Sequence, residues 1–203
     1  MNILKNILDE NIIIETERLK IYPFRINFKT IEDLFAIYSK STNVENYCTV
    51  HHNFDDFNDY IRRKIENFQI IDNGIISFTI ELKENSKIIG VRNIILDGIY
   101  TNNGNREINN KNIITEILIK EEHWRKGFAF EASNALFKFL KTKGIENILA
   151  FVNSKDKKAD NLDEKLGFKY TSLEEAINQF NYHKDFGIHG YKTNQTHILL
   201  KTL

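Results

Sequence analysis

The feature that most limits how this chain can fold is an apolar run followed at once by a basic turn and a helical pattern. Residues 113–119 read Ile-Ile-Thr-Glu-Ile-Leu-Ile, interrupted only by Thr115 and Glu116. After the turn Trp124-Arg125-Lys126-Gly127, apolar residues recur at spacings of three and four: Ala132, Ala135, Leu136, Phe139 and Leu140. This pattern predicts a buried strand, a sharp turn at Gly127 and then an amphipathic helix.

The predicted turn has the properties of an anion site. The backbone amides of residues 126–130 would be first-turn donors without intrahelical partners, at the positive end of the helix dipole. Arg125 and Lys126 add two positive charges. A phosphate suits these properties best, although a plain strand-to-helix connection with an exposed basic pair would use the same residues. The turn is neither a P-loop nor a three-glycine dinucleotide loop.

Length and charge restrict the class of protein. The chain has 203 residues without a repeat or linker, so we expect a single domain spanning residues 1–203. Its 28 basic and 28 acidic residues cancel, and no basic patch with interleaved aromatic residues suggests nucleic-acid binding. No apolar run is long enough to span a membrane, and the N-terminus lacks a signal-peptide pattern. The single cysteine, Cys48, fits a reducing compartment, and no Cys/His spacing suggests a metal site. We therefore expect a cytoplasmic protein without a metal.

The rest of the chain predicts an order of elements around this centre. The turn chemistry and the apolar spacings separate the strands from the helices. We expect strands near residues 19–22, 75–82, 87–96, 113–119, 148–152, 168–170 and 198–200. We expect helices near residues 31–38, 54–68 and 154–166, and a central helix that follows the turn and is capped by Gly144. We also expect a short leading helix at residues 3–8, a β-bulge at Gly90, a polar hairpin loop over residues 101–112 and an insertion over residues 173–193.

Three segments in this order resemble the GNAT (Gcn5-related N-acetyltransferase) superfamily. The family's pyrophosphate motif, Gln/Arg-x-x-Gly-x-Gly/Ala, is similar to Trp124-x-x-Gly127-x-Ala129 here. The fuller stretch from Trp124 to Ala132, and the lead-in Thr16-Glu17-Arg18-Leu19, resemble the branch that acetylates the N-termini of ribosomal proteins. The segment Glu164-Lys165-Leu166-Gly167-Phe168 resembles the family's closing motif, where the fourth helix leads back into the sheet. The resemblance covers about residues 16–203 and implies an α+β fold. In that fold a mostly antiparallel, twisted sheet of about seven strands contains one splayed parallel pair and is flanked by about four helices.

The resemblance implies an acetyl-CoA-dependent N-acetyltransferase, with acetyl-CoA between the 113–119 and 148–152 strands. Backbone groups of Ile117, Leu118 and Ile119 would then hold the pantetheine and the thioester. The turn would bind the pyrophosphate through Trp124, Arg125, Lys126, Gly127, Phe128, Ala129 and Phe130. The family's CoA-contacting Asn-x-x-Ser reads Asp156-x-x-Ala159, so we expect Asn153 to substitute for it.

Glu116 is the candidate general base, because acetyl transfer requires a neutral amine. A lysine amine, with a pKa near 10.4, is only about one part in a thousand neutral at pH 7.4, whereas an α-amine is already partly neutral. Glu116 lies in an apolar strand beside the expected thioester, where burial would raise its pKa. Alternatively, it points to a solvated face or pairs with a lysine. The similar branch usually carries its glutamate at the position of Ile114, two residues away on the same strand face.

Other roles stay open at this stage. The tyrosine that many family members use as general acid falls at Asp163, so the matched position does not carry that role. His51 and His52 could line an acceptor pocket with Tyr47, although a surface loop is the more common setting for such a pair. The acceptor can be a ribosomal-protein N-terminus or a small amine, and the protein a monomer or a homodimer. The rival hypothesis is a CoA-binding sensor or interaction module without catalysis.

Overall fold

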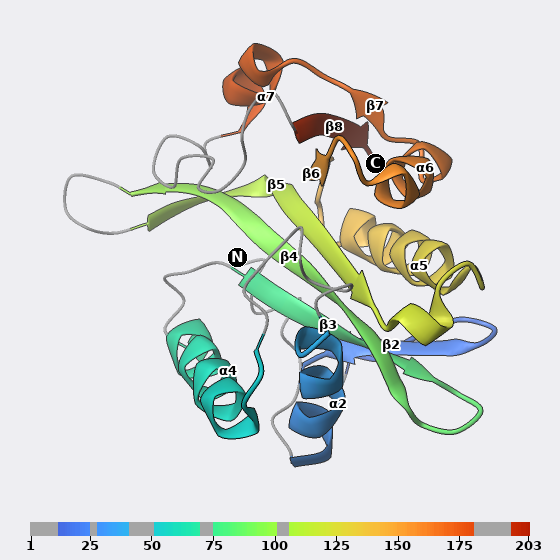
Figure 1. Cartoon of the computed structure of the whole chain (residues 1–203). Coiled ribbons are helices and arrows are strands. Elements are labelled where there is room, and N and C mark those ends of the chain that lie inside the picture. The colour runs from blue at the N-terminus through green and yellow to red at the C-terminus, as the bar shows by residue number, and fades with distance from the viewer. Residues whose placement is uncertain (1–11, 25–27, 41–50, 70–74, 101–105, 181–195) are drawn as a thin grey trace.

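A computed structural model describes residues 12–24, 28–40, 51–69, 75–100, 106–180 and 196–203 (Figure 1). Within these ranges the chain forms eight strands, five α-helices and one 3₁₀ helix. In chain order they are β1 (Ile14–Glu15), β2 (Leu19–Pro23), α2 (Phe28–Tyr38), α4 (Phe54–Gln69), β3 (Ile75–Leu82), β4 (Ile88–Tyr100), β5 (Arg106–Ile119), η1 (Glu121–His123), α5 (Phe128–Thr142), β6 (Asn147–Asn153), α6 (Lys157–Lys165), β7 (Lys169–Tyr170), α7 (Leu173–Gln179) and β8 (Thr196–Thr202).

All eight strands belong to one sheet, in the order β1-β2-β3-β4-β5-β6-β8-β7. Neighbouring strands are antiparallel except for β5 and β6, which run parallel. This confirms the expected α+β class, with one parallel pair in a mostly antiparallel sheet. The strand beyond the expected seven is the two-residue β1. The helix beyond the expected four is α7, which occupies the start of the segment predicted as an insertion.

Side chains on β5 alternate between the two faces of the sheet. Ile113, Ile117 and Ile119 belong to the largest core cluster, which α5 covers with Leu136 and its neighbours. Leu118, on the other face, packs in a second cluster with α2 and α4. α5 therefore covers one face of the sheet, and α2 and α4 cover the other (Figure 1).

Hairpin β4–β5 is longer than the sequence indicates. The predicted polar loop over residues 101–112 is wrong for its second half, because β5 already begins at Arg106 and pairs there with Tyr100. Ladder hydrogen bonds are made by the backbone, so polar side chains can continue a strand without apolar alternation. Asn112 shows what one of these polar residues does. Its Nδ2 donates to the Gln179 carbonyl at 2.7 Å, and its Oδ1 accepts from Asn147 at 3.0 Å, which ties β5 to β6 and α7.

The predicted irregularity at Gly90 is confirmed. Ile80 pairs with Gly90, but Glu81 pairs with Ile88, so one extra residue bulges out of β4 beside the glycine. A Cβ atom on Gly90 would lie 2.5 Å from the carbonyl oxygen of Leu118. Glycine is therefore required here because the backbones of β4 and β5 approach so closely.

The predicted helix boundaries agree with the structure to within three residues, since α2 begins at Phe28 and α6 at Lys157. Asn53 caps α4, since its Oδ1 accepts from the amides of Asp55 (2.8 Å) and Asp56 (3.2 Å). No helix among the described residues is long and apolar enough to cross a membrane. The predicted leading helix at residues 3–8, Tyr47, Cys48 and residues 181–193 lie outside the described ranges.

Candidate active site

The connection from β5 to α5 has the geometry expected of an anion-binding turn. Arg125 has φ 60° and Gly127 has φ 83°, so the backbone turns twice through the left-handed region before α5 begins at Phe128. Glu131 N donates to Gly127 O at 3.0 Å, the first i→i−4 bond of this helix. The amides of residues 128–130 precede that bond and have no intrahelical acceptor. Together with the positive end of the helix dipole, they form the donor set that a phosphate requires.

Trp124 holds the start of this turn against the sheet. Its indole Nε1 donates to Ile119 O at 2.7 Å. Lys158, in the first turn of α6, places its ammonium 3.9 Å from the centre of the indole ring. Arg125 and Lys126 are exposed. The cationic side chains at the turn therefore include one, Lys158, that comes from α6.

A gap opens between β5 and β6 next to this turn. Their pairing covers only Asn112–Thr115 with Asn147–Ala150, although both strands continue beyond it. From Glu116 onward, the edge of β5 that pairs with β6 up to Thr115 is no longer paired with it. On this stretch the carbonyl of Ile119 already accepts the Trp124 indole, and the carbonyl of Leu118 faces Gly90 on β4. That backbone groups of Ile117, Leu118 and Ile119 hold a ligand stays a prediction. A pocket occupies the gap, lined by Arg92, Thr115, Glu116, Ile117, Ala150, Phe151, Val152, Ala159, Leu162 and Asp163.

Glu116 lines this pocket and is half-buried. It lies on the face of the sheet opposite α5, the same face as Leu118. Asn93 is its pairing partner on β4 and donates from Nδ2 to Glu116 Oε2 at 3.4 Å. Ser77 on β3 in turn donates to Asn93 Oδ1 at 2.7 Å. Glu116 thus ends a row of three polar residues that crosses β3, β4 and β5.

Asp163 is a second carboxyl in the pocket, and only 6% of it is exposed. Within the described part of the chain, its carboxyl has no hydrogen-bond partner. The pKa of Asp163 is raised to about 6, mainly by burial; the charge of Arg92 lowers it and the charge of Asp160 raises it. No role was predicted for Asp163 from the residue pattern alone. The available signal was a charged residue at the spacing of Ala159, Leu162 and Leu166, on the buried side of α6.

Arg92 is the buried cation of this site, at 2% exposure. Its Nε donates to Thr115 Oγ1 at 2.9 Å and its Nη1 to Ser133 Oγ at 2.7 Å. The guanidinium lies 4.7 Å from the ring centre of Phe137. Arg92 thereby joins β4, β5 and α5 at the point where the two strands separate.

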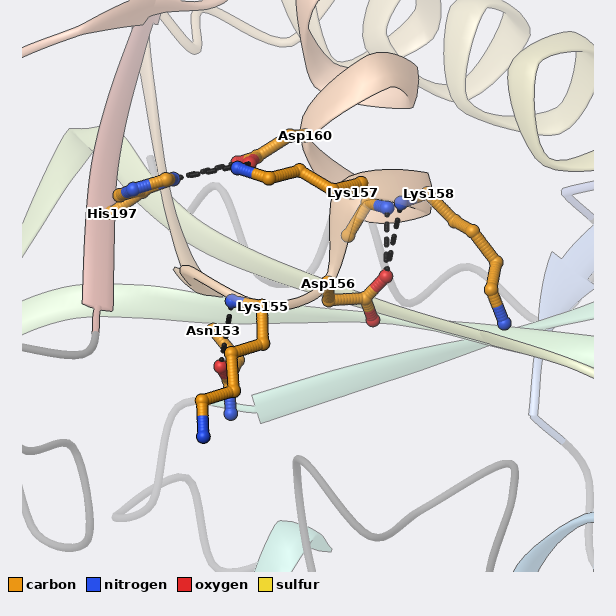
Figure 2. A network of polar contacts seen from close by, with 8 residues as sticks. Asn153, Lys155, Asp156, Lys157, Lys158, Asp160 and His197 are labelled. Carbon is orange, nitrogen blue, oxygen red and sulfur yellow. Dashed lines mark hydrogen bonds and ion pairs between the residues drawn. The ribbon is translucent and has the colours of Figure 1, made fainter.

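Asn153 and Asp156 organise the turn from β6 to α6, as Figure 2 shows. Asn153 Oδ1 accepts from the amide of Lys155 at 3.0 Å. Asp156 is the N-cap of α6 and accepts from the amides of Lys158 (3.2 Å) and Ala159 (3.1 Å). A cap explains why an aspartate is suitable at this position. That Asn153 also contacts a cofactor stays a prediction.

His51, one of the predicted pair, and His123, which follows β5, lie in different surroundings. The ring centre of His51 lies 4.6 Å from that of Tyr60 in a tilted arrangement and 5.2 Å from that of Phe57, edge to face, within the aromatic cluster between α2 and α4. His123 lies just before the turn of residues 124–127 and packs against Phe128. Burial lowers the pKa of His123, and the nearby lysines lower it further. No group of three or more potential metal-ligating side chains occurs among the described residues.

A family model described as "Acetyltransferase (GNAT) domain" matches residues 18–169, about three quarters of the chain. No curated protein matches the sequence. Spermidine N-acetyltransferase from Vibrio cholerae, solved with CoA and spermine, superposes with a TM-score of 0.64 at 18% identity, covering 92% of this chain and 96% of that one.

Two further solved structures show the same fold. A Vibrio cholerae protein provisionally described as a ribosomal-protein-serine acetyltransferase has a TM-score of 0.67 at 12% identity, covering 96% of this chain and 99% of its own. The microcin C7 self-immunity acetyltransferase MccE, solved with acetyl-CoA and AMP, has a TM-score of 0.64 at 16% identity, covering 93% and 94%.

Proposed function

The chain belongs to the GNAT acetyltransferase family, and from this premise we propose that it transfers the acetyl group of acetyl-CoA to a primary amine by direct attack. The observation that carries the proposal is the position of the phosphate turn. It lies at the end of the same strand, β5, that separates from β6 to open a pocket with two carboxyls. One ligand with a phosphate end and a thioester end can use both parts.

The proposed cofactor site combines the predicted residues with those that the geometry adds. The pyrophosphate would lie on the amides of residues 128–130, with Trp124, Arg125, Lys126 and Gly127 shaping the turn. The pantetheine would take the place of β6 along Ile117, Leu118 and Ile119. Lys158 extends this positive surface from the side of α6. Solved members of this fold with CoA or acetyl-CoA bound support this choice of cofactor.

In the proposed reaction, the amine nitrogen attacks the thioester carbonyl. Glu116 accepts the proton that the nitrogen loses, directly or through one water molecule. The carbon–sulfur bond then breaks, and Asp163 in its neutral form gives a proton to the departing thiolate. A carboxyl with a pKa near 6 is better suited to that donation than an unperturbed aspartate. The products are an acetamide and free CoA.

For the acceptor, we propose a protein N-terminus as the first candidate and a small amine as the second. The stretches Trp124–Ala132 and Thr16–Leu19, which resemble the ribosomal-protein branch, favour the first. An α-amine also requires less assistance from a base than a lysine-like amine. Because the fold is similar to that of a spermidine acetyltransferase, a polyamine is one of the small amines to be tested as acceptor.

The test is release of free thiol from acetyl-CoA by the full chain, with a panel of amines. The panel contains peptides with free N-termini, lysine, spermidine and an amino sugar, and a reaction without acceptor sets the background. We expect at least one amine to raise the rate well above this background, with the acetylated product visible by mass spectrometry. CoA binding without acceptor-dependent release from any amine would instead support the alternative, a CoA-binding sensor or interaction module.

A further inference from the structure

Arg18 makes an unusually complete set of contacts with the phosphate turn, 108 to 113 positions away in the sequence. Its Nε donates to Glu131 Oε2 at 2.7 Å, and its Nη2 lies 2.6 Å from the same oxygen. Its Nη1 donates to the carbonyl of Lys126 at 3.0 Å. The guanidinium carbon is 4.4 Å from the ring centre of Phe128. Every nitrogen of the guanidinium therefore contacts the turn or the first turn of α5.

The second oxygen of Glu131 is also held. Thr16 Oγ1 donates to Glu131 Oε1 at 2.6 Å, and the backbone amide of Arg18 donates to it at 3.0 Å. Burial raises the pKa of Glu131, but the hydrogen bonds from Thr16 and Arg18 and the Arg18 charge outweigh it, so that pKa lies below its usual range. Glu131 is therefore a fully engaged carboxylate at neutral pH.

Arg18 contacts both ends of the segment that carries the amides of residues 128–130. Lys126 O precedes the amides of residues 128–130, and the Glu131 side chain follows them. Because Arg18 bonds to both, the separation of the two ends is fixed by one planar, rigid group. The Arg18 donors face the protein, and Nη2 lies 3.4 Å from where a Cβ of Gly127 would be. Arg18 thus supports the turn from the side of β1 and β2.

We propose that Arg18, Glu131 and Thr16 form a brace that presets the phosphate-binding shape of residues 126–130, and that this brace sets the affinity for CoA without contacting it. The inference rests on the proposed function, since it takes CoA as the ligand of the turn. It also gives a physical role to the Thr16-Glu17-Arg18-Leu19 segment, which the catalytic scheme does not use.

The brace explains why a carboxylate, that of Glu131, lies next to a turn proposed to bind phosphate. Electrostatics alone would disfavour a negative side chain close to a phosphate, so replacing Glu131 with a neutral residue should strengthen CoA binding. A brace has the opposite consequence, because a loosened turn must be ordered again when CoA binds. The sign of the change in affinity on Glu131→Gln therefore separates the two explanations.

The experiment measures the dissociation constant of CoA by calorimetry for the full chain and for Arg18→Gln, Arg18→Lys and Glu131→Gln. Glu146→Gln is the matched control, because it removes an exposed ion pair (Lys111–Glu146) elsewhere. We expect about tenfold weaker binding in all three brace variants, the usual order of effect for a supporting residue, and no change in the control. The double variant Arg18→Gln/Glu131→Gln should be hardly weaker than either single variant, because the two side chains act as a unit.

Activity and fluorescence supply independent readouts. The KM for acetyl-CoA should rise while kcat at saturating acetyl-CoA changes little. Trp124 is the only tryptophan in the chain, so its emission reports on the turn. Thermal melts verify folding. If Arg18→Gln has a lower Tm than the wild type, the CoA affinity of Glu131→Gln, which keeps the shape of the side chain, still tests the brace.

Tighter or unchanged CoA binding in Glu131→Gln, or wild-type binding in Arg18→Lys, would overturn the brace. The first result would assign the dominant effect of Glu131 to its charge, and the second would assign that of Arg18 to its charge. Failure of the wild-type chain to bind CoA would instead remove the proposed function, and the brace with it. Wild-type binding and turnover with unaffected variants would remove only the brace.

Discussion

At the scale of single residues, the two carboxyls that line the gap between β5 and β6 stand in different surroundings. Glu116 is half-buried and accepts a hydrogen bond from Asn93 on the face of the sheet opposite α5. Asp163 is almost fully buried on α6 and has no hydrogen-bond partner for its carboxyl among the described residues. Two titratable groups with divergent surroundings are the usual basis for separate base and acid roles.

For Glu116 we predict that Glu116→Gln lowers the rate of acetyl transfer about 100- to 10,000-fold, the usual range for a positioned general base. The substitution keeps the shape and removes the proton acceptor, so the affinity for CoA measured by calorimetry should stay the same. The loss should be larger for spermidine or lysine than for a peptide α-amine, because their higher pKa requires more deprotonation. A full rate with both kinds of acceptor would assign Glu116 to structure.

For Asp163 we predict that Asp163→Asn makes the protein more stable above pH 6 and less active. The pKa is about 6 in the folded chain and 3.8 in the unfolded reference. The stability linked to this group is thus present below pH 3.8 and is lost as the pH rises through 6. Above pH 6 the buried carboxylate destabilises the fold by at most about 3 kcal/mol.

The measurement for Asp163 is urea unfolding of both proteins at pH 4 and pH 8, alongside kcat. The asparagine variant should gain stability mainly at pH 8, while kcat falls because it cannot donate a proton to the thiolate. An unchanged kcat would remove Asp163 from the reaction, and a lower stability at pH 8 would show that its carboxylate supports the fold.

At the scale of elements, the strand–turn–helix around Gly127 was predictable because its signals are local. Apolar runs, one glycine and a basic pair define it within about 30 residues. The brace from Arg18 and the position of Asp163 were not predictable in the same way. Both depend on which elements the sheet brings together, and Arg18 and Glu131 are 113 residues apart in the chain. Polar residues at the start of β5 were missed because backbone pairing leaves no side-chain pattern.

For the turn itself we predict that Gly127→Val removes measurable CoA binding in calorimetry. Valine is strained at φ 83°, and its Cβ would lie only 3.4 Å from Arg18 Nη2, so the substitution distorts the turn that presents the amides. Lys126→Ala is the comparison, because an exposed charge near the ligand should contribute only about 0.2 to 1 kcal/mol. Abolished binding in Lys126→Ala alone would mean that side-chain charge, and not the amides, carries the affinity.

At the scale of the whole molecule, the sheet consists of two parts joined by a short connection. β1 to β5 form one part, and β6, β8 and β7 form the other. Four residue pairs, between Asn112–Thr115 and Asn147–Ala150, join them. The hydrogen bond from Asn147 on β6 to Asn112 on β5 reinforces this seam. The proposed ligand would lie where the seam ends and would contact β5, α5 and α6 together.

We therefore predict that CoA stabilises the whole chain against heat, because a ligand that contacts both parts of the sheet binds only the folded state. At a free CoA concentration of about 100 times its dissociation constant, the gain is about 2.7 kcal/mol. For a chain of this length, that corresponds to a rise of roughly 5–10 °C in Tm. Thermal melts followed by the fluorescence of Trp124 and by far-ultraviolet circular dichroism measure it. If the ligand joins the two parts, both signals should shift by the same amount, since one reports on the turn and the other on the entire sheet. Gly127→Val should melt at the same temperature with and without CoA. A shift in the Trp124 signal alone would mean that CoA orders the turn locally and does not bridge the two parts of the sheet.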